Sequence, residues 1–64
     1  MENRIREIRE QQGIKQYELA EMTELSSSYI NHLEKGTRDN PSFKAMVKIS
    51  KALKRQLQEV FNVD

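Results

Sequence analysis

Cysteine is absent from this sequence of 64 residues, and histidine occurs once. Without cysteine the chain can form no disulfide framework and no thiolate metal site, and a single histidine supplies too few ligands for a zinc site of the usual kind. No apolar run approaches the about 20 residues that a helix needs to span a bilayer. The charged N-terminus lacks the apolar segment of a signal peptide. These absences predict a cytoplasmic protein with no metal and no membrane span.

The sequence patterns that mark enzymes are also missing. The chain has two glycines, which form no phosphate-binding loop, and no motif pairs a nucleophile with a base. His32 stands outside any cluster of cysteines or carboxylates, so we expect neither a catalyst nor a metal ligand there. We therefore expect no enzyme, no cofactor and no small-molecule site. A chain of this length forms one domain, residues 1–64, with a small core.

The charge is balanced overall but not along the chain. Eleven Lys and Arg stand against ten Asp and Glu, for a net charge of +1. Residues 1–34 contain four basic and seven acidic side chains, a net charge of −3, whereas residues 35–64 contain seven basic and three acidic ones, a net charge of +4. The basic region that begins at residue 35 is where the phosphates of a nucleic acid would be met.

Residues 26–36 form the segment around which the rest of the chain is organised. Ser26 is a good N-cap, because its hydroxyl can accept from a backbone N–H one turn further on. Gly36 suits the left-handed residue just past a helix C-terminus. Between them, Ile30 and Leu33 form one narrow apolar stripe that faces a core. The other side of this helix carries Ser27, Ser28, Asn31, His32 and Lys35.

Two interpretations of this polar face compete. A plain solvated helix surface is usually filled with Glu and Lys. Short hydroxyl, amide and imidazole groups with little negative charge suit the reading of base edges in DNA. The segment alone does not distinguish the two interpretations, so the neighbouring helices are needed to choose between them.

Helical spacing of apolar residues predicts four further helices, over about 2–12, 16–23, 42–53 and 56–61, and therefore an all-α fold. A three-residue turn with a buried Leu25 joins the helix at 16–23 to the helix at 27–35. The small Ala20 lets these two helices cross closely. Together with Leu19, Ile30 and Leu33, these residues predict a helix-turn-helix unit whose second helix protrudes with one polar face free.

The predicted helix at 42–53 has two distinct faces. Its apolar stripe is interpreted as core rather than as a cofactor pocket. It contains Phe43, Met46, Val47, Ser50 and Leu53, and is widened by Ile49 and Ala52. The opposite face is interpreted as a solubilising surface rather than a DNA-binding surface, and contains Lys44, Lys48 and Lys51.

The ordered set of these residues resembles the phage repressor and Cro family of helix-turn-helix domains, also called the xenobiotic-response-element family. The resemblance covers nearly the whole chain, through Ile5-Arg6…Arg9…Gly13-Ile14-Lys15-Gln16…Glu18-Leu19-Ala20-Glu21, then Leu25-Ser26…Ile30…Leu33-Glu34-Lys35-Gly36, then Arg38…Asn40-Pro41-Ser42…Leu53…Leu57…Phe61. It implies a compact, lambda-repressor-like fold of five helices, in which the second and third form the DNA-binding unit.

By position, the resemblance also implies a base-reading set and a structural ion pair. Arg9 and Glu34 match a partly buried salt bridge that ties the first helix to the end of the third. This agrees with the position of Arg9 beside the apolar stripe of its own helix. The positions implied to read bases, or to flank those that do, are Ser27, Ser28, Asn31 and His32.

A second set of residues is implied to hold the DNA backbone. Gln16 matches a phosphate contact that also braces the base-reading residues. Lys35, Thr37 and Arg38 match a loop that grips the sugar–phosphate chain. We add Tyr17 and Tyr29 as candidate phosphate contacts, against the simpler interpretation of Tyr17 as an exposed ring without a contact.

The sequence departs from the family pattern in three places. Glu24 stands where the family usually has glycine, and in a left-handed conformation it costs about 1 kcal/mol relative to glycine. The segment 54–56 replaces the usual break before the fifth helix, which leaves open whether the fourth and fifth helices are continuous. The loop around Asp39 is one residue longer than is typical, so the phosphate partner stays open among Arg38, Asn40 and Ser42.

These features predict a sequence-specific DNA-binding transcription regulator that inserts the helix at 27–35 into a major groove, with repression as the expected mode. Because one domain makes few phosphate contacts, we expect a homodimer on palindromic double-stranded DNA. The fifth helix is expected to bury Leu57 and either Val60 or Phe61. The expected dimer surface is this helix with the C-terminal tail, where Val60, Phe61 and Val63 offer more apolar side chains than a small core uses. The alternative is a protein-binding adaptor, antitoxin or antirepressor with the same fold, whose recognition face would carry apolar anchors.

Overall fold

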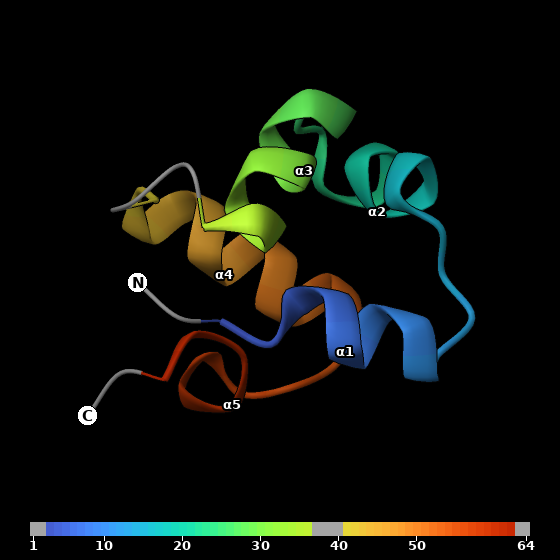
Figure 1. The fold of residues 1–64 in the computed structure, drawn as a ribbon. Coiled ribbons are helices and arrows are strands. Elements are labelled where there is room, and N and C mark those ends of the chain that lie inside the picture. The colour runs from blue at the N-terminus through green and yellow to red at the C-terminus, as the bar shows by residue number, and fades with distance from the viewer. Residues whose placement is uncertain (1–2, 37–40, 63–64) are drawn as a thin grey trace.

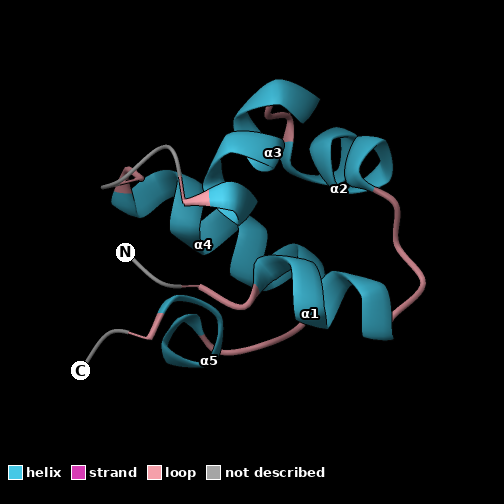
Figure 2. Cartoon of the chain, in the orientation of Figure 1, coloured by secondary structure: helices cyan, strands magenta, loops and turns pink. Residues whose placement is uncertain are grey.

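The computed structural model describes residues 3–36 and 41–62, which fold into five helices and contain no strand (Figures 1 and 2). The helices are α1 (Ile5–Gln11), α2 (Gln16–Thr23), α3 (Ser27–Lys35), α4 (Phe43–Leu53) and α5 (Leu57–Phe61). The predicted all-α fold is confirmed, and α2 and α3 have the bounds that the sequence predicted.

The ends of α3 show why its bounds follow from the local sequence. The Ser26 hydroxyl accepts a hydrogen bond from the Tyr29 backbone N–H at 3.0 Å, as an N-cap does. Gly36 adopts the left-handed conformation, with a φ of 75°. Ser42 caps α4 in the same way, accepting from the Ala45 N–H at 3.1 Å. Both caps are local signals, so they can be recognised in the sequence without knowledge of how the helices pack.

The start of α1 differs from the prediction, which placed it at residue 2. The helix begins at Ile5, whose N–H donates to the side chain of Asn3 at 3.2 Å. The amide group of Asn3 also donates to the Leu33 carbonyl at 2.9 Å, and the Arg4 N–H donates to the Val60 carbonyl at 2.7 Å. Asn3 and Arg4 are therefore held by contacts with α3 and α5, which helical periodicity does not report.

The core lies where the five helices meet. Helix α2 packs against α3 and α4, while α4 also packs against α1 and α5. The core cluster contains Ile5, Ile8, Leu19, Ala20, Ile30, Leu33, Ile49, Leu53, Val60 and Phe61. Leu25 in the turn is partly buried and packs against this cluster, as predicted.

Two predictions about apolar residues are wrong. Phe43 was assigned to the core, but it is 70% exposed. Ala45, Ile49 and Leu53, spaced by four, set the buried stripe of α4, and Phe43 lies about 120° around the helix from Ile49. Val60 and Phe61 were assigned to a dimer surface, yet they are 0% and 1% exposed within the single chain. They fill its own core, and Val63 lies outside the described residues.

Helices α4 and α5 are separate rather than continuous. Lys54 adopts a left-handed conformation with a φ of 57°, and the Arg55 N–H turns back to the Ser50 carbonyl at 3.1 Å. This closes α4 at Leu53, and α5 begins at Leu57. The break therefore forms without the glycine that usually supplies a left-handed residue.

Glu24 ends α2 in a left-handed conformation, with a φ of 60°. A side chain at such a position is strained relative to glycine. We therefore expect Glu24→Gly to raise the free energy of unfolding by about 1 kcal/mol, measured by urea denaturation. The exposed mid-helix residue Glu21 is the control, since Glu21→Gly should lower stability by a similar amount. A destabilised Glu24→Gly variant would contradict the argument from backbone strain.

Candidate nucleic-acid interface

Helices α2 and α3 lie together on one side of the molecule, and α5 lies on the opposite side (Figure 1). The turn between α2 and α3 is held by a hydrogen bond from the Leu25 N–H to the Ala20 carbonyl at 3.1 Å. Ile30 and Leu33 anchor α3 to the core, at 0% and 1% exposure. Because these two anchors take one face of the helix, the opposite face is left at the surface.

The structure brings the predicted polar residues of α3 together on that surface. They fall within about 140° of the helix circumference, opposite the two anchors. Ser27, Ser28, His32 and Lys35 are exposed, whereas Asn31 and Tyr29 are half-buried. The described part of this face carries hydroxyl, imidazole and ammonium groups but no carboxylate, so it can meet an electronegative partner without charge repulsion.

The side chains of Asn31 and Gln16 are bonded to each other. The side-chain amide of Gln16 donates to the Asn31 side chain at 3.2 Å and to one oxygen of Glu34 at 3.1 Å. These two bonds occupy both hydrogens of the amide. Gln16 therefore braces α3 against the start of α2, and a phosphate contact by this side chain requires one of the two bonds to be exchanged.

Arg9 and Glu34 form the ion pair that the resemblance implied. Two nitrogens of the guanidinium donate to the two carboxylate oxygens, at 2.8 and 3.1 Å, and a third donates to the Ile14 carbonyl at 2.8 Å. The side chains of Arg9 and Glu34 are 10% and 3% exposed. The hydrogen bonds that Arg9 donates to the Glu34 carboxylate raise the pKa of Arg9 above its usual value, against the opposing effect of burial. This fork ties α1 to the end of α3.

The remaining predicted contacts stand outside this network. Tyr17 is 55% exposed on α2, and the Lys15 ammonium lies 6.0 Å from the centre of its ring. Thr37 and Arg38 lie outside the described residues, as do Asp39 and Asn40. The structure thus places the base-reading candidates on one helix face, and it leaves the predicted backbone loop undescribed beyond Gly36.

One residue of the site was missed by the sequence analysis. Arg6 lines a polar hollow between α1, α2 and α3, together with Arg9, Gln16, Asn31, Glu34 and Lys35. The signal was available, since Arg6 precedes the inward-facing Arg9 by three residues and so lies on a neighbouring part of the same helix face.

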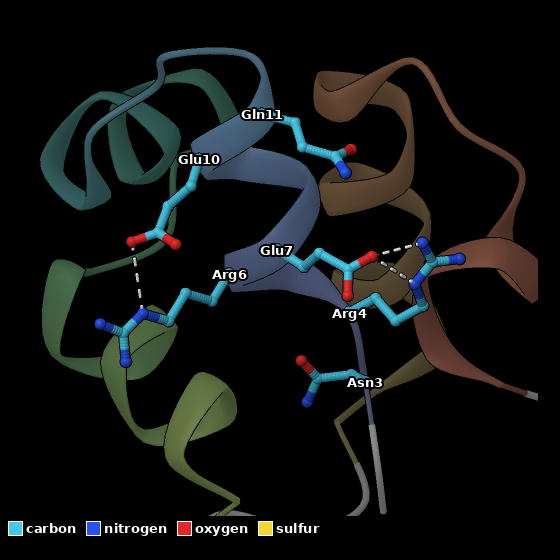
Figure 3. Close-up of a pocket in the computed structure, with 6 residues that line it drawn as sticks. All are labelled: Asn3, Arg4, Arg6, Glu7, Glu10 and Gln11. Atoms are coloured by element: carbon cyan, nitrogen blue, oxygen red, sulfur yellow. Dashed lines mark hydrogen bonds and ion pairs between the residues drawn. The ribbon is translucent and has the colours of Figure 1, made fainter.

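The outer surface of α1 carries an open depression (Figure 3). Its side chains form two exposed ion pairs, Arg4 with Glu7 and Arg6 with Glu10. Residues 3–36 and 41–62 contain no group of three His, Cys, Asp or Glu placed to hold a metal ion. Within the same ranges, no helix has the length and apolar character to cross a membrane.

Comparisons with known proteins identify relatives. A family model described as Helix-turn-helix matches residues 5–60. The restriction-modification controller protein C.AhdI from Aeromonas hydrophila is 36% identical, with a TM-score of 0.82 over 88% of this chain and 83% of that chain. No curated protein matches the sequence.

A second solved relative is SinR, described as the master regulator for biofilm formation. In its structure in complex with DNA, the SinR chain is 31% identical in sequence to this chain. The TM-score is 0.82, and the match covers 86% of this chain and 87% of that chain. The N-terminal DNA binding domain of SinR from Bacillus subtilis is also 31% identical, with a TM-score of 0.81 over 86% of this chain and 80% of that chain.

Proposed function

Because this chain belongs to the helix-turn-helix family of Cro/C1-type DNA-binding transcription regulators, we propose that it recognises one operator sequence by placing α3 in the major groove of double-stranded DNA. The observation that carries this proposal is the exposed polar face of α3, held by a partly buried hydrogen-bond network behind it. A major groove admits one α-helix, and its base edges offer the donors and acceptors that such a face can match.

The proposed roles of individual residues follow from their positions. Ser27, Ser28 and His32 read base edges, with Asn31 at the boundary between base reading and bracing. Short hydroxyl groups reach bases only on close approach or through ordered water, so part of the specificity then comes from DNA shape. The proposed phosphate contacts are Gln16, Tyr17, Tyr29, Lys35, Thr37 and Arg38.

The proposed complex is a homodimer on a palindromic operator in the cytoplasm, where it represses transcription by occluding the polymerase. A single domain of this size contacts few phosphates, and each phosphate contact adds a limited, salt-dependent increment of affinity. Two copies on half-sites one helical turn apart double the contacts and match the symmetry of a palindrome. SinR in complex with DNA supports the DNA partner by similarity.

Selection of bound duplexes from a random DNA pool at near-physiological salt tests this function. We expect a palindrome to be enriched, with two half-sites about 10 base pairs apart. A single enriched half-site would retain the DNA-binding function and overturn the dimer. If no sequence is enriched and only weak, salt-sensitive binding remains, specific recognition is wrong, and a protein-binding adaptor becomes the better account.

A further inference from the structure

The polar hollow between α1, α2 and α3 contains more positive than negative charge. Its lining includes three cations, on Arg6, Arg9 and Lys35, and one carboxylate, on Glu34. Gln16 and Asn31 supply the neutral part of the wall. The hollow opens beside the polar face of α3, since Asn31 and Lys35 belong to both. Its charge therefore lies next to the surface where DNA is proposed to bind.

The single carboxylate of the lining is fully engaged inside the protein. One oxygen of Glu34 accepts from Arg9 at 2.8 Å, and the other accepts from Arg9 at 3.1 Å and from Gln16 at 3.1 Å. Its side chain is 3% exposed, so its charge is met by Arg9. The positive charges of Arg6 and Lys35 are consequently left without a balancing carboxylate in the hollow itself.

Arg6 lies at the rim on the α1 side. Its side chain is 71% exposed. It contacts Glu10 only through its Nε, which lies 3.4 Å from a carboxylate oxygen of Glu10. Figure 3 shows Arg6 and Glu10 on the flank of α1 that faces α2 and α3, whereas Arg4 and Glu7 lie on the flank that faces α4 and α5. The two terminal nitrogens of Arg6 remain able to donate to an anion at the mouth of the hollow.

Lys35 lies at the rim on the α3 side. It is exposed, and it forms no salt bridge with any residue in the part of the chain that the structure describes. Two exposed cations from different helices thus flank one polar depression. A guanidinium fork can bind two oxygens of a phosphate, while an ammonium contributes a point charge to the same group.

We propose that this hollow binds one phosphate of the DNA backbone, with Arg6 of α1 and Lys35 of α3 as its ligands. The inference rests on the proposed function and extends the DNA contact to α1, outside the helix-turn-helix unit. It adds Arg6 to the proposed phosphate contacts. Gln16 joins this contact only by exchanging one of the bonds that its side-chain amide donates to Asn31 and Glu34.

The salt dependence of operator binding tests the role of Arg6. Arg6→Gln removes the charge at an exposed position, so the fold is retained. We expect the slope of log K against log salt concentration to become shallower by about 0.9, the value for one lost phosphate contact, while the selected DNA sequence stays the same. Arg6→Lys, which keeps the charge, should restore most of the slope.

The matched control is Arg4→Gln. Arg4 is on the same helix and has an exposed acidic partner, Glu7, but it lies on the other flank. We expect its slope to equal that of the unmodified protein. Equal slopes for the unmodified protein, Arg6→Gln and Arg4→Gln on a bound operator would overturn the phosphate site and leave the proposed function intact. An equal loss of slope in Arg6→Gln and Arg4→Gln would do the same. Failure of the unmodified protein to bind any operator would overturn both.

Discussion

Glu34→Ala is expected to lower the free energy of unfolding by about 3–5 kcal/mol, because it leaves a buried guanidinium without its carboxylate. Arg9 is 8% exposed and donates twice to Glu34. Gln16 loses one of its two acceptors in the same variant. A domain of this size has a total stability of roughly 3–10 kcal/mol, so a large fraction of the variant should be unfolded. Urea denaturation followed by circular dichroism measures the loss.

Two further variants separate the ion pair from general effects of truncation. Glu7→Ala removes a carboxylate from an exposed pair with Arg4 and should change stability by less than about 0.5 kcal/mol. The double variant Arg9→Met/Glu34→Leu removes both buried charges and should recover much of the loss, because no unpaired charge remains. A loss below about 1 kcal/mol in Glu34→Ala would contradict the account of the pair as the tie between α1 and α3.

Ser28→Glu is expected to reduce operator affinity by about 100-fold or more without reducing stability. Ser28 is exposed in the first turn of α3. A carboxylate there faces the phosphates and base acceptors of a groove, and like-charge contacts of this kind cost several kcal/mol. The same carboxylate is favourable at a helix N-terminus, so the free energy of unfolding should stay constant or rise slightly. The expected loss of binding is therefore not accompanied by a loss of stability.

Gln58→Glu is the control for the change in net charge. It adds one negative charge at an exposed residue of α5, on the side of the molecule opposite α3 (Figure 1). We expect its operator affinity to fall by no more than about threefold, from the weaker long-range charge effect. Both affinities are measured by fluorescence anisotropy at one salt concentration. A Ser28→Glu variant that binds like Gln58→Glu would contradict the placement of α3 at the DNA.

The parts of the fold that the sequence predicted correctly are those with local causes. Ser26 and Gly36 fix the ends of α3 through bonds and backbone conformations within a few residues, so α3 required no knowledge of packing. The separation of α4 from α5 remained open because Lys54 gives no such local signal. Lysine is not a residue type that marks a left-handed helix end, so its φ of 57° could not be predicted from the local sequence.

The errors concern residues whose positions depend on distant parts of the chain. Phe43 has the spacing of a core residue, but the buried stripe of α4 is set by the helices against it. Val60 and Phe61 were treated as surplus apolar residues because the capacity of a small core is not visible in a sequence. The start of α1 depends on Asn3 reaching the Leu33 carbonyl, thirty residues away.

The candidate site also contains features that the sequence predicted and features that depend on contacts between distant parts of the chain. The polar face of α3 followed from helical periodicity, and the Arg9–Glu34 pair followed from the family resemblance together with the position of Arg9 on its helix. The bond between Gln16 and Asn31 did not follow from either, because the direction of a long amide side chain depends on which acceptors surround it. The spacing of Arg6 from Arg9 was visible in the sequence, but the hollow that Arg6 lines forms only when three helices are placed together.

The central claim is that α3 reads base edges in a major groove, and methylation interference on the selected operator tests it most directly. Methylation of guanine N7 blocks the major groove, whereas methylation of adenine N3 blocks the minor groove. We predict that N7 methylation within the half-sites abolishes binding and that N3 methylation there has little effect. Interference confined to adenine N3, or none at either atom, would contradict the account.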